Sequence, residues 1–253
     1  MRSLQTFELT GGLSKMKSNS QKGFTLVELS IVLVIIGLII GGILKGQELI
    51  GNAQVKNVMA QAQSYEAATV SFMDKYNAMP GDLQNANTML SASCTATPCT
   101  SGNGDGVIGA DVGAAYATST LTGAENISYW QHLSLGRFIG GIVGGTDSTS
   151  TYGSRFPSAV TGGGFQIAYS LPSGRHAVRL AGTLAAPDPA SGALRADQAL
   201  QLDNRLDDGR PVTGTVQTNA TISSNTTCYD PAGSSSYRAA LTAQSCNVVF
   251  VIR

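Results

Sequence analysis

The longest apolar run of the chain extends from Phe24 to Leu44 and contains a single charged residue, Glu28. A helix of this length rises about 31 Å, which matches the hydrocarbon thickness of a bilayer. A buried core helix usually keeps one polar face, and a removable secretory signal has a shorter apolar stretch followed by a small-residue cleavage site. The run therefore favours a retained membrane anchor over both alternatives.

Beyond this run the pattern becomes amphipathic. One stripe of residues recurs at alternating three- and four-residue steps, as expected for one face of a helix: Val55, Val58, Ala62, Tyr65, Thr69, Phe72 and Tyr76. Pro80 and Gly81 follow, and proline cannot continue a helix. We therefore expect one helix from Phe24 to about Tyr76, whose second half packs against the sheet of a globular head.

Residues 78–253 have the length of a proper globular head. Their first part, 78–165, is rich in loop residues, with one expected helix within Glu125–Leu135. A second short helix is expected later, at Leu194–Asp208, ending on a Gly209 C-cap. The β-rich runs are Phe165–Leu171, His176–Leu184, Pro211–Thr218 and Cys246–Ile252. Hairpin-like strands after a long helix predict an α+β fold, with an antiparallel sheet laid across the helix.

The distribution of charge along the chain predicts how the chain is oriented in a membrane. The 16 basic and 16 acidic residues balance, so the sequence lacks the basic excess of a protein that binds nucleic acid by bulk charge, and we expect no direct nucleic-acid partner. Lys15, Lys17 and Lys22 precede the apolar run. Under the positive-inside rule they hold the N-terminus in the cytoplasm and send the head across the membrane.

Glu28 needs an explanation, because a carboxylate at membrane depth is costly without a partner. It stands in Lys22-Gly23-Phe24-Thr25-Leu26-Val27-Glu28-Leu29, which resembles the class III signal of type IV pilins and pseudopilins. The resemblance implies cleavage between Gly23 and Phe24 by a prepilin peptidase, and N-methylation of Phe24. It also implies that Glu28 neutralises the N-terminal amine of a neighbouring subunit during assembly.

The resemblance extends into the head through the segments 76–83, 102–106 and 130–133, which together are similar to a large-headed group of prepilin-type proteins. It implies three parts: a leader over residues 1–23, an N-terminal helix over 24–77 with its transmembrane and assembly segment at 24–44, and a pilin-like head over 78–253. Translation from Met16 instead of Met1 would shorten the leader, and the sequence leaves both starts open.

The four cysteines form two local pairs and allow three connectivities. Disulfides are expected outside the inner membrane, where the compartment is oxidising. We favour Cys94 with Cys99 and Cys228 with Cys246; the second loop resembles the D-region of type IV pilins. A zinc site is the alternative, but zinc pairs usually have closer cysteines or nearby histidines.

A glycine-rich loop carries the candidate metal ligands Asn103, Asp105 and Asp111. Oxygen ligands at alternate positions with glycine at the turn partly match a calcium loop, although no bidentate Glu occupies the twelfth position. The same residues also form Gly/Asn/Asp turns that need no ion. Asp203, Asp207 and Asp208 form a second acidic group, which is more typical of the solvated end of a helix.

The sequence contains none of the common catalytic signatures: no Gly-x-Ser-x-Gly elbow, no His-Glu-x-x-His pair and no P-loop. We therefore expect a structural protein rather than an enzyme, with the bacterial inner membrane, a prepilin peptidase and other pilin-like subunits as partners. It would be a single-pass protein with a periplasmic head and then part of a filament. A pilus subunit is favoured over a type II secretion pseudopilin or a DNA-uptake pilin; a membrane-tethered binding protein that never polymerises is the alternative from another class.

Overall fold

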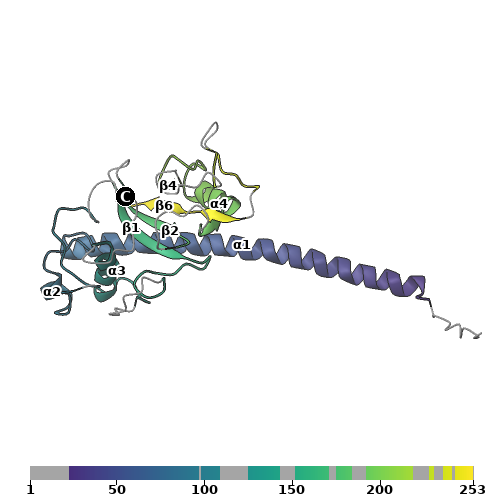
Figure 1. Cartoon of the computed structure of the whole chain (residues 1–253), viewed down its shortest axis with the longest axis horizontal. Helices are drawn as coiled ribbons and strands as arrows, with labels where there is room; N and C mark the ends of the chain where they lie inside the picture. The colour runs from purple at the N-terminus through teal and green to yellow at the C-terminus, as the bar shows by residue number, and fades with distance from the viewer. Residues whose placement is uncertain are drawn as a thin grey trace, which may run out of the picture. The chain divides into compact units, whose positions relative to one another are not determined.

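The computed structural model describes residues 23–96, 98–108, 125–142, 152–170, 175–183, 192–218, 228–230, 236–240 and 243–252. The chain divides into two compact units, Met1–Gln47 and Glu48–Arg253. Helix α1 (Leu26–Tyr76) begins in the first unit and ends in the second (Figure 1). It ends where expected, because Asn77 adopts a positive φ of 51° and Pro80 follows.

In the second unit α1 buries one face. The buried residues largely reproduce the predicted stripe, with Tyr65 and Tyr76 partly exposed and Ala68 added: Val55, Val58, Ala62, Ala68, Thr69 and Phe72. The ring of Tyr65 packs edge-on against Trp130 and Phe165, with centroids 5.1 Å apart in both pairs. Because Phe165 belongs to the sheet, the predicted packing of this helix half against a sheet is confirmed.

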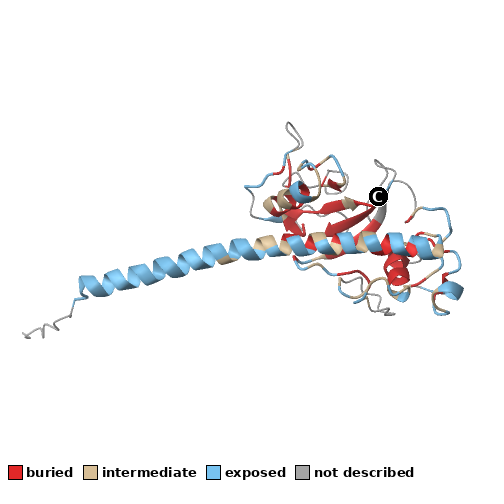
Figure 2. Cartoon of the chain, turned by 180° about the vertical axis from the view of Figure 1, so that it is seen from behind, coloured by how far each residue is buried: buried red, intermediate tan, exposed pale blue. Residues whose placement is uncertain are grey.

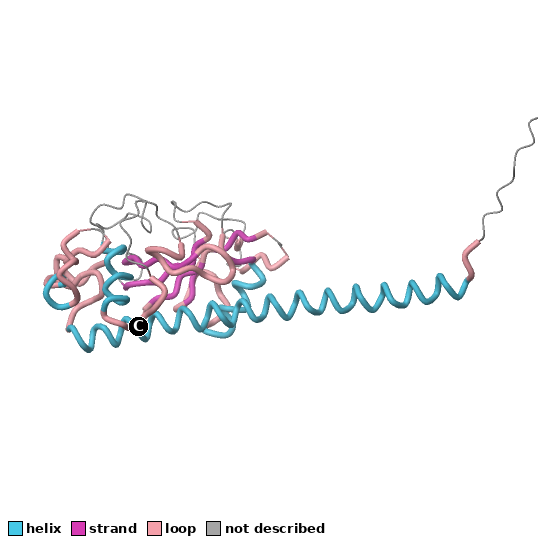
Figure 3. Tube along the Cα trace, turned by 90° about the horizontal axis from the view of Figure 1, so that it is seen from below, coloured by secondary structure: helices cyan, strands magenta, loops and turns pink. Residues whose placement is uncertain are grey.

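The main sheet is antiparallel, with strands in the order β1-β2-β6-β4. Strands are coloured magenta in Figure 3. Its strands are β1 (Gly164–Ser170), β2 (Arg175–Ala181), β6 (Val248–Val251) and β4 (Val216–Gln217). Phe165 pairs with Leu180 and Ile167 with Val178, so these side chains share the face that contacts α1. The predicted α+β class, with a long helix and an antiparallel sheet, is thus confirmed.

Two of the predicted strands are shorter than expected. The strand predicted over Pro211–Thr218 is reduced to β4, because the N–H of Thr218 turns back to the carbonyl of Pro211 at 2.7 Å. The strand predicted from His176 ends at Ala181, because the N–H of Gly182 donates to the side chain of Asn247 rather than to β1. Leu171 and Leu184, the predicted ends of two strands, lie outside the described residues.

The run predicted as one strand over Cys246–Ile252 is divided between two sheets. Strand β5 (Gln244–Cys246) pairs with β3 (Leu194–Arg195) in a separate two-stranded sheet, and β6 follows after Asn247. Asn247 is buried, and its Oδ1 accepts the N–H of Gly182. This side-chain contact marks where the chain changes from one sheet to the other.

Helix α3 (Glu125–Leu135) has the predicted bounds. It buries all of residues 126–133, the polar side chains among them as well as the apolar ones. The hydroxyl of Tyr129 hydrogen-bonds that of Thr69 on α1. The short helix α2 (Ala86–Met89) was not predicted.

Helix α4 (Ala196–Leu206) is shorter than the predicted Leu194–Asp208, because Leu194 and Arg195 pair with β5. The predicted Gly209 C-cap is wrong: the C-cap is Asp207, and the N–H of Gly209 donates to the carboxylate of Asp203. Gly209 nevertheless adopts the positive φ, 74°, that suggested a cap.

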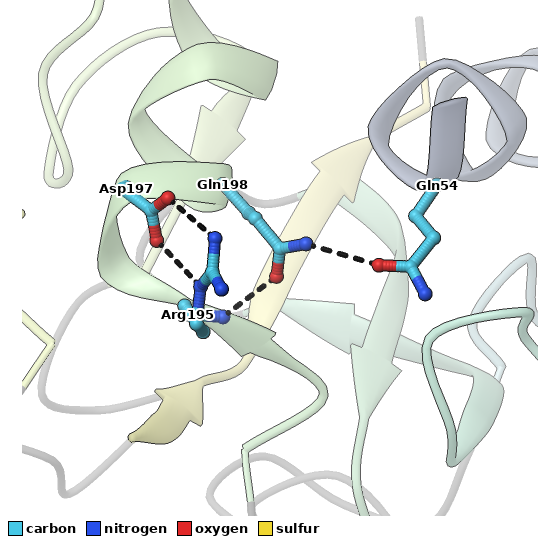
Figure 4. Close-up of polar contacts among 4 residues, drawn as sticks. All are labelled: Gln54, Arg195, Asp197 and Gln198. Carbon is cyan, nitrogen blue, oxygen red and sulfur yellow. Dashed lines mark hydrogen bonds and ion pairs between the residues drawn. The ribbon is translucent and has the colours of Figure 1, made fainter. Parts of the chain in front are cut away.

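The start of α4 is tied to α1 by a polar network (Figure 4). The side chain of Gln198 accepts the N–H of Arg195 at 3.1 Å and donates to Oε1 of Gln54 at 3.2 Å. Arg195 makes a two-pronged ion pair with Asp197, at 2.9 and 2.8 Å. The contact joins α4 to the helix face that also carries Val55 and Val58.

The carboxylates after α4 fold the loop that leads to β4. Asp207 Oδ2 accepts the N–H groups of Thr215 and Val216. Asp208 Oδ1 accepts the N–H of Arg210 at 2.9 Å. This acidic group therefore has a structural role, whereas the sequence suggested a merely solvated helix end.

Asp203 is the buried member of that group. The hydroxyl of Tyr237 donates to its Oδ2 at 2.8 Å, and the N–H of Gly209 donates to its Oδ1 at 3.2 Å. Burial nevertheless raises the pKa of Asp203 to about 6, since desolvation outweighs the two hydrogen bonds.

All four cysteines are paired, Cys94 with Cys99 and Cys228 with Cys246, at S–S distances of 2.05 and 2.01 Å. This is the pairing that the sequence favoured. The second bond joins the segment around Cys228 to β5, and both of its cysteines are fully buried.

We predict that Asp203→Asn changes the pH dependence of stability. The folded state keeps a proton on Asp203 between its unfolded pKa of about 4 and its folded pKa of about 6. Stability from this group is thus full below pH 4 and is lost as the pH rises through 6. Asparagine keeps an acceptor without the charge. As the pH rises from 4 to 7, the free energy of unfolding of the variant should therefore increase relative to that of wild type, by up to about 3 kcal/mol at about 1.4 kcal/mol per pKa unit.

Urea unfolding of the full chain in detergent, followed by fluorescence of the single tryptophan, Trp130, measures this difference. A stability difference that stays constant from pH 4 to 7 would contradict the raised pKa of Asp203.

We also predict that the two disulfides contribute unequally. Cys228 and Cys246 enclose the longer loop, with a sequence separation of 18 against 5. In the loop-entropy model their joint replacement by alanine costs about 3 kcal/mol, against about 2 kcal/mol for the Cys94 and Cys99 pair. The same unfolding assay compares the two double variants, and the reverse order would show that chain entropy does not govern their contributions.

Candidate functional site

The N-terminal segment presents the predicted cleavage point openly. Gly23, Phe24 and Thr25 precede α1 without helical structure, and all three are exposed. A Cβ placed on Gly23 would meet no atom within 4 Å. The backbone between Gly23 and Phe24 is therefore accessible, within the part of the chain that the structure describes.

Thr25 and Glu28 form a capping box at the start of α1. The N–H and the hydroxyl of Thr25 donate to Glu28 Oε2 at 2.9 and 3.0 Å. The N–H of Glu28 donates in return to the hydroxyl of Thr25 at 3.2 Å. Such a pair satisfies N–H groups that the first turn of a helix leaves without partners.

Sequence reasoning missed this second role of Glu28. The signal was present, because threonine followed three residues later by glutamate, ahead of an apolar run, is the signature of a capping box. The carboxylate is thus held at the positive end of the helix, four residues from Phe24. In this position it can accept hydrogen bonds from any amine that approaches the same end.

Among the described residues of the first unit, 23–47, none covers the apolar part of α1. From Leu26 to Leu44 its large apolar side chains are all at least 46% exposed, and Leu26 and Leu38 reach 86% and 74% (Figure 2). By length and composition this helix is able to cross a membrane. Exposed apolar surface of this extent indicates a membrane or another protein around it.

In the head, Asp82 organises the loop that was predicted to bind calcium. Its Oδ1 accepts the N–H of Gly104 at 2.5 Å, and its Oδ2 accepts that of Gly106 at 2.8 Å. Both glycines have positive φ, 78° and 79°. The loop is thereby closed around a buried carboxylate that lies about twenty residues away in sequence.

The structure brings Asp105, one of the predicted metal ligands, into a cluster of carboxylates with Asp82 and Glu125. Ligand oxygens of these three residues lie within 4.8 Å of one another. Asn103, another predicted ligand, lies beside these carboxylates: its N–H donates to Glu125 Oε1 at 3.1 Å and its Nδ2 donates to Asp105 Oδ2 at 2.8 Å. Its side-chain Oδ1 in turn accepts the N–H of Asp105 at 2.9 Å. Asp111 lies outside the described residues.

Asp82 and Glu125 were missed because no local spacing connects them to the loop. The hydrogen bonds of Asp82 and Asp105 to backbone N–H groups account for the loop conformation. Calcium binding here stays a prediction.

Both ring nitrogens of His132 and one of His176 contact the backbone. His132 Nδ1 accepts the N–H of Gly81 at 2.8 Å, and its Nε2 lies 3.0 Å from the carbonyl of Thr100. Burial lowers the pKa of His132 to about 4, so the ring is neutral at pH 7. His176 Nε2 accepts the N–H of Ile108 at 3.1 Å, and burial also lowers its pKa. All four cysteines are in disulfides, so none of them is a thiolate ligand for the zinc site that was considered as an alternative.

Comparison with known proteins identifies the N-terminal segment. Residues 18–44 match the family described as the prokaryotic N-terminal methylation motif. No curated protein matches the chain. Among solved structures, the major type IV pilin PilA1 from Clostridium difficile is similar, with 13% identity, a TM-score of 0.37, and coverage of 80% of this chain and 96% of that chain.

The matched segment contains Gly23, Phe24, Glu28 and the whole exposed apolar run. It thus includes the residues that carry the resemblance in the sequence. This N-terminal motif supports a relationship of the chain to type IV pilins and pseudopilins.

Proposed function

We propose that the chain is a structural subunit of a type IV pilus-like filament. The observation that carries the proposal is the uncovered apolar part of α1, which lies within the matched methylation motif. A membrane covers this surface before assembly, and the same helix surfaces of other subunits cover it afterwards. The three parts at 1–23, 24–77 and 78–253 are then the leader, the assembly helix and the outward-facing head.

Processing supplies the group that Glu28 needs. Cleavage between Gly23 and Phe24 creates an α-amine at the start of the helix, and methylation of Phe24 keeps an amine that is able to carry a positive charge. An unpaired amine and an unpaired carboxylate are each costly at membrane depth, so joining them favours packing of one subunit onto the next. The bonds of Thr25 to Glu28 hold the carboxylate until the neighbouring amine arrives.

The same motif serves type II secretion pseudopilins, which is the second candidate within this class. The disulfide between Cys228 and Cys246 gives the head a stapled C-terminal region and favours a pilus. The basic residues Lys15, Lys17 and Lys22 support a periplasmic head before assembly.

We predict that the mature protein begins at N-methylated Phe24. Intact mass and N-terminal sequencing of membrane-extracted protein from its own host measure this directly. A retained leader in a host with an active prepilin peptidase would instead support a tethered head that does not polymerise. Cleavage beyond Leu44 would show that the apolar run is a removable secretory signal.

Glu28 offers a matched set of variants that separates its charge from its capping role. Glu28→Gln keeps an oxygen that accepts the N–H of Thr25 but removes the charge, whereas Thr25→Ala breaks the cap, at about 1 kcal/mol, and keeps the charge. We expect Glu28→Gln and Glu28→Ala both to be cleaved normally and both to lower filament yield at least tenfold. Thr25→Ala should assemble to within a few-fold of wild type.

Sheared-filament yield and immunoblots of the membrane fraction measure assembly and cleavage separately. Normal assembly of Glu28→Gln, together with failure of Thr25→Ala, would assign Glu28 to helix capping alone and remove its proposed pairing with the amine.

A further inference from the structure

Two short segments of the C-terminal region pair with each other next to the second disulfide. Residues 228–230 and 236–238 are antiparallel, and the N–H of Arg238 donates to the carbonyl of Cys228 at 2.9 Å. A second backbone hydrogen bond of 3.0 Å and an isolated β-bridge complete the pairing. We call these two segments the loop pair. The disulfide from Cys228 to Cys246 joins it to β5.

A buried hydrogen bond connects the loop pair to α4. The hydroxyl of Tyr237 donates to Asp203 Oδ2 at 2.8 Å. Asp203 has no exposed surface and Tyr237 is 8% exposed, so water does not compete for this bond as it does at the protein surface. The contact joins the loop pair to a helix residue that lies 34 positions earlier in the sequence.

Two further carboxylates lie beside Asp203. Ligand oxygens of Asp203, Asp207 and Asp208 are within 4.8 Å of one another. Carboxylates this close are costly to ionise together, so one of them keeps its proton to a higher pH than an isolated carboxylate does. Asp203 is that one, because it is buried, whereas Asp208 is exposed and lies beside Arg210. Among the described residues, the titratable groups that face Asp203 are these two carboxylates and the hydroxyl of Tyr237.

We propose that Asp203 and Tyr237 form a proton-controlled latch: the loop pair stays closed on α4 while Asp203 is neutral, and opens more often once Asp203 has lost its proton. In the closed state an ionised Asp203 is buried next to two other carboxylates. Opening exposes it to water and removes this cost. The disulfide keeps the open loop pair attached to β5, so the motion stays within the C-terminal loop.

The direction of the pH effect follows from the two states of Asp203. In the closed state burial raises the pKa of Asp203 to about 6, although the bond from Tyr237 favours the charged form. In the open state the pKa returns to about 4. The closed state is therefore most stable below pH 4 and loses stability as the pH rises to 6. Between pH 5 and 7.5 the equilibrium constant for opening rises about tenfold. The latch acts within one head and does not depend on the proposed role in a filament.

Residue-resolved hydrogen–deuterium exchange of the full chain in detergent tests the latch. The amides of Asp230 and Arg238 form the two backbone bonds of the loop pair and report its opening. After correction for the pH dependence of chemical exchange itself, their protection factors should be about tenfold lower at pH 7.5 than at pH 5. At both pH values they should also be at least tenfold lower than those of the buried helix α3, because the latch opens without unfolding of the head.

Three variants separate the titrating group from the bond. Asp203→Asn should remove the change between pH 5 and 7.5 to within twofold, because the amide cannot lose a proton. Tyr237→Phe removes the hydroxyl but leaves Asp203 in place, so it should lower protection at both pH values and keep the pH effect. The matched control is Asp74→Asn, which removes an exposed carboxylate of α1 and should keep the full wild-type change.

Three results would overturn the latch. The first is wild-type protection of the loop pair that is equal at pH 5 and 7.5. The second is a pH effect that survives in Asp203→Asn. The third is equal protection of the loop pair and α3, which would show that the loop pair opens only when the whole head unfolds. These results leave the proposed filament role intact, since cleavage and assembly test that role separately.

Discussion

The uncovered apolar surface of α1 is the constraint on which the rest of this structure depends. One continuous helix passes through two environments: its first part exposes apolar residues on every side, and its second part buries one face under the head. At about 25 cal/mol per Å² of apolar surface, leaving the first part in water is unfavourable by far more than any single contact in the head can offset. The first part of α1 is therefore stable only within a bilayer or among other apolar helices. The second part continues the same helix and is stabilised by the head, which covers one of its faces.

Glu28 is the single charged residue of the apolar run, and a carboxylate in apolar surroundings is costly. In the single chain its carboxylate caps the first turn through Thr25, where free N–H groups and the helix dipole favour a negative charge. The two bonds satisfy one carboxylate oxygen without supplying an opposite charge. A positively charged partner is thus still favourable, and the capping role and the proposed pairing with an amine complement each other.

Much of this organisation could be predicted from the sequence, because it follows from local patterns. The end of α1 at Tyr76, the bounds of α3 and the buried stripe that begins at Val55 depend on periodicity and on Asn77 to Gly81. The errors lie where side chains from distant positions replace backbone partners. Asn247 interrupts the last strand, Asp207 folds the segment before β4, and Asp82 closes a loop that looked self-contained. No spacing rule connects residues so far apart, so only Asp105 of the three clustered carboxylates was predicted from the sequence.

The hydrogen bonds at the edge of the main sheet bear on how copies of the chain associate. An exposed edge strand offers N–H and C=O groups to a strand from another molecule. At the β4 edge, Asp207 takes the N–H groups of Thr215 and Val216, and the carbonyl of Pro211 takes that of Thr218. With these donors already used within the chain, β4 has little to offer to strand addition. Among the described residues, most of the exposed large apolar side chains lie on α1, so packing of helix side chains is favoured over strand addition at the β4 edge.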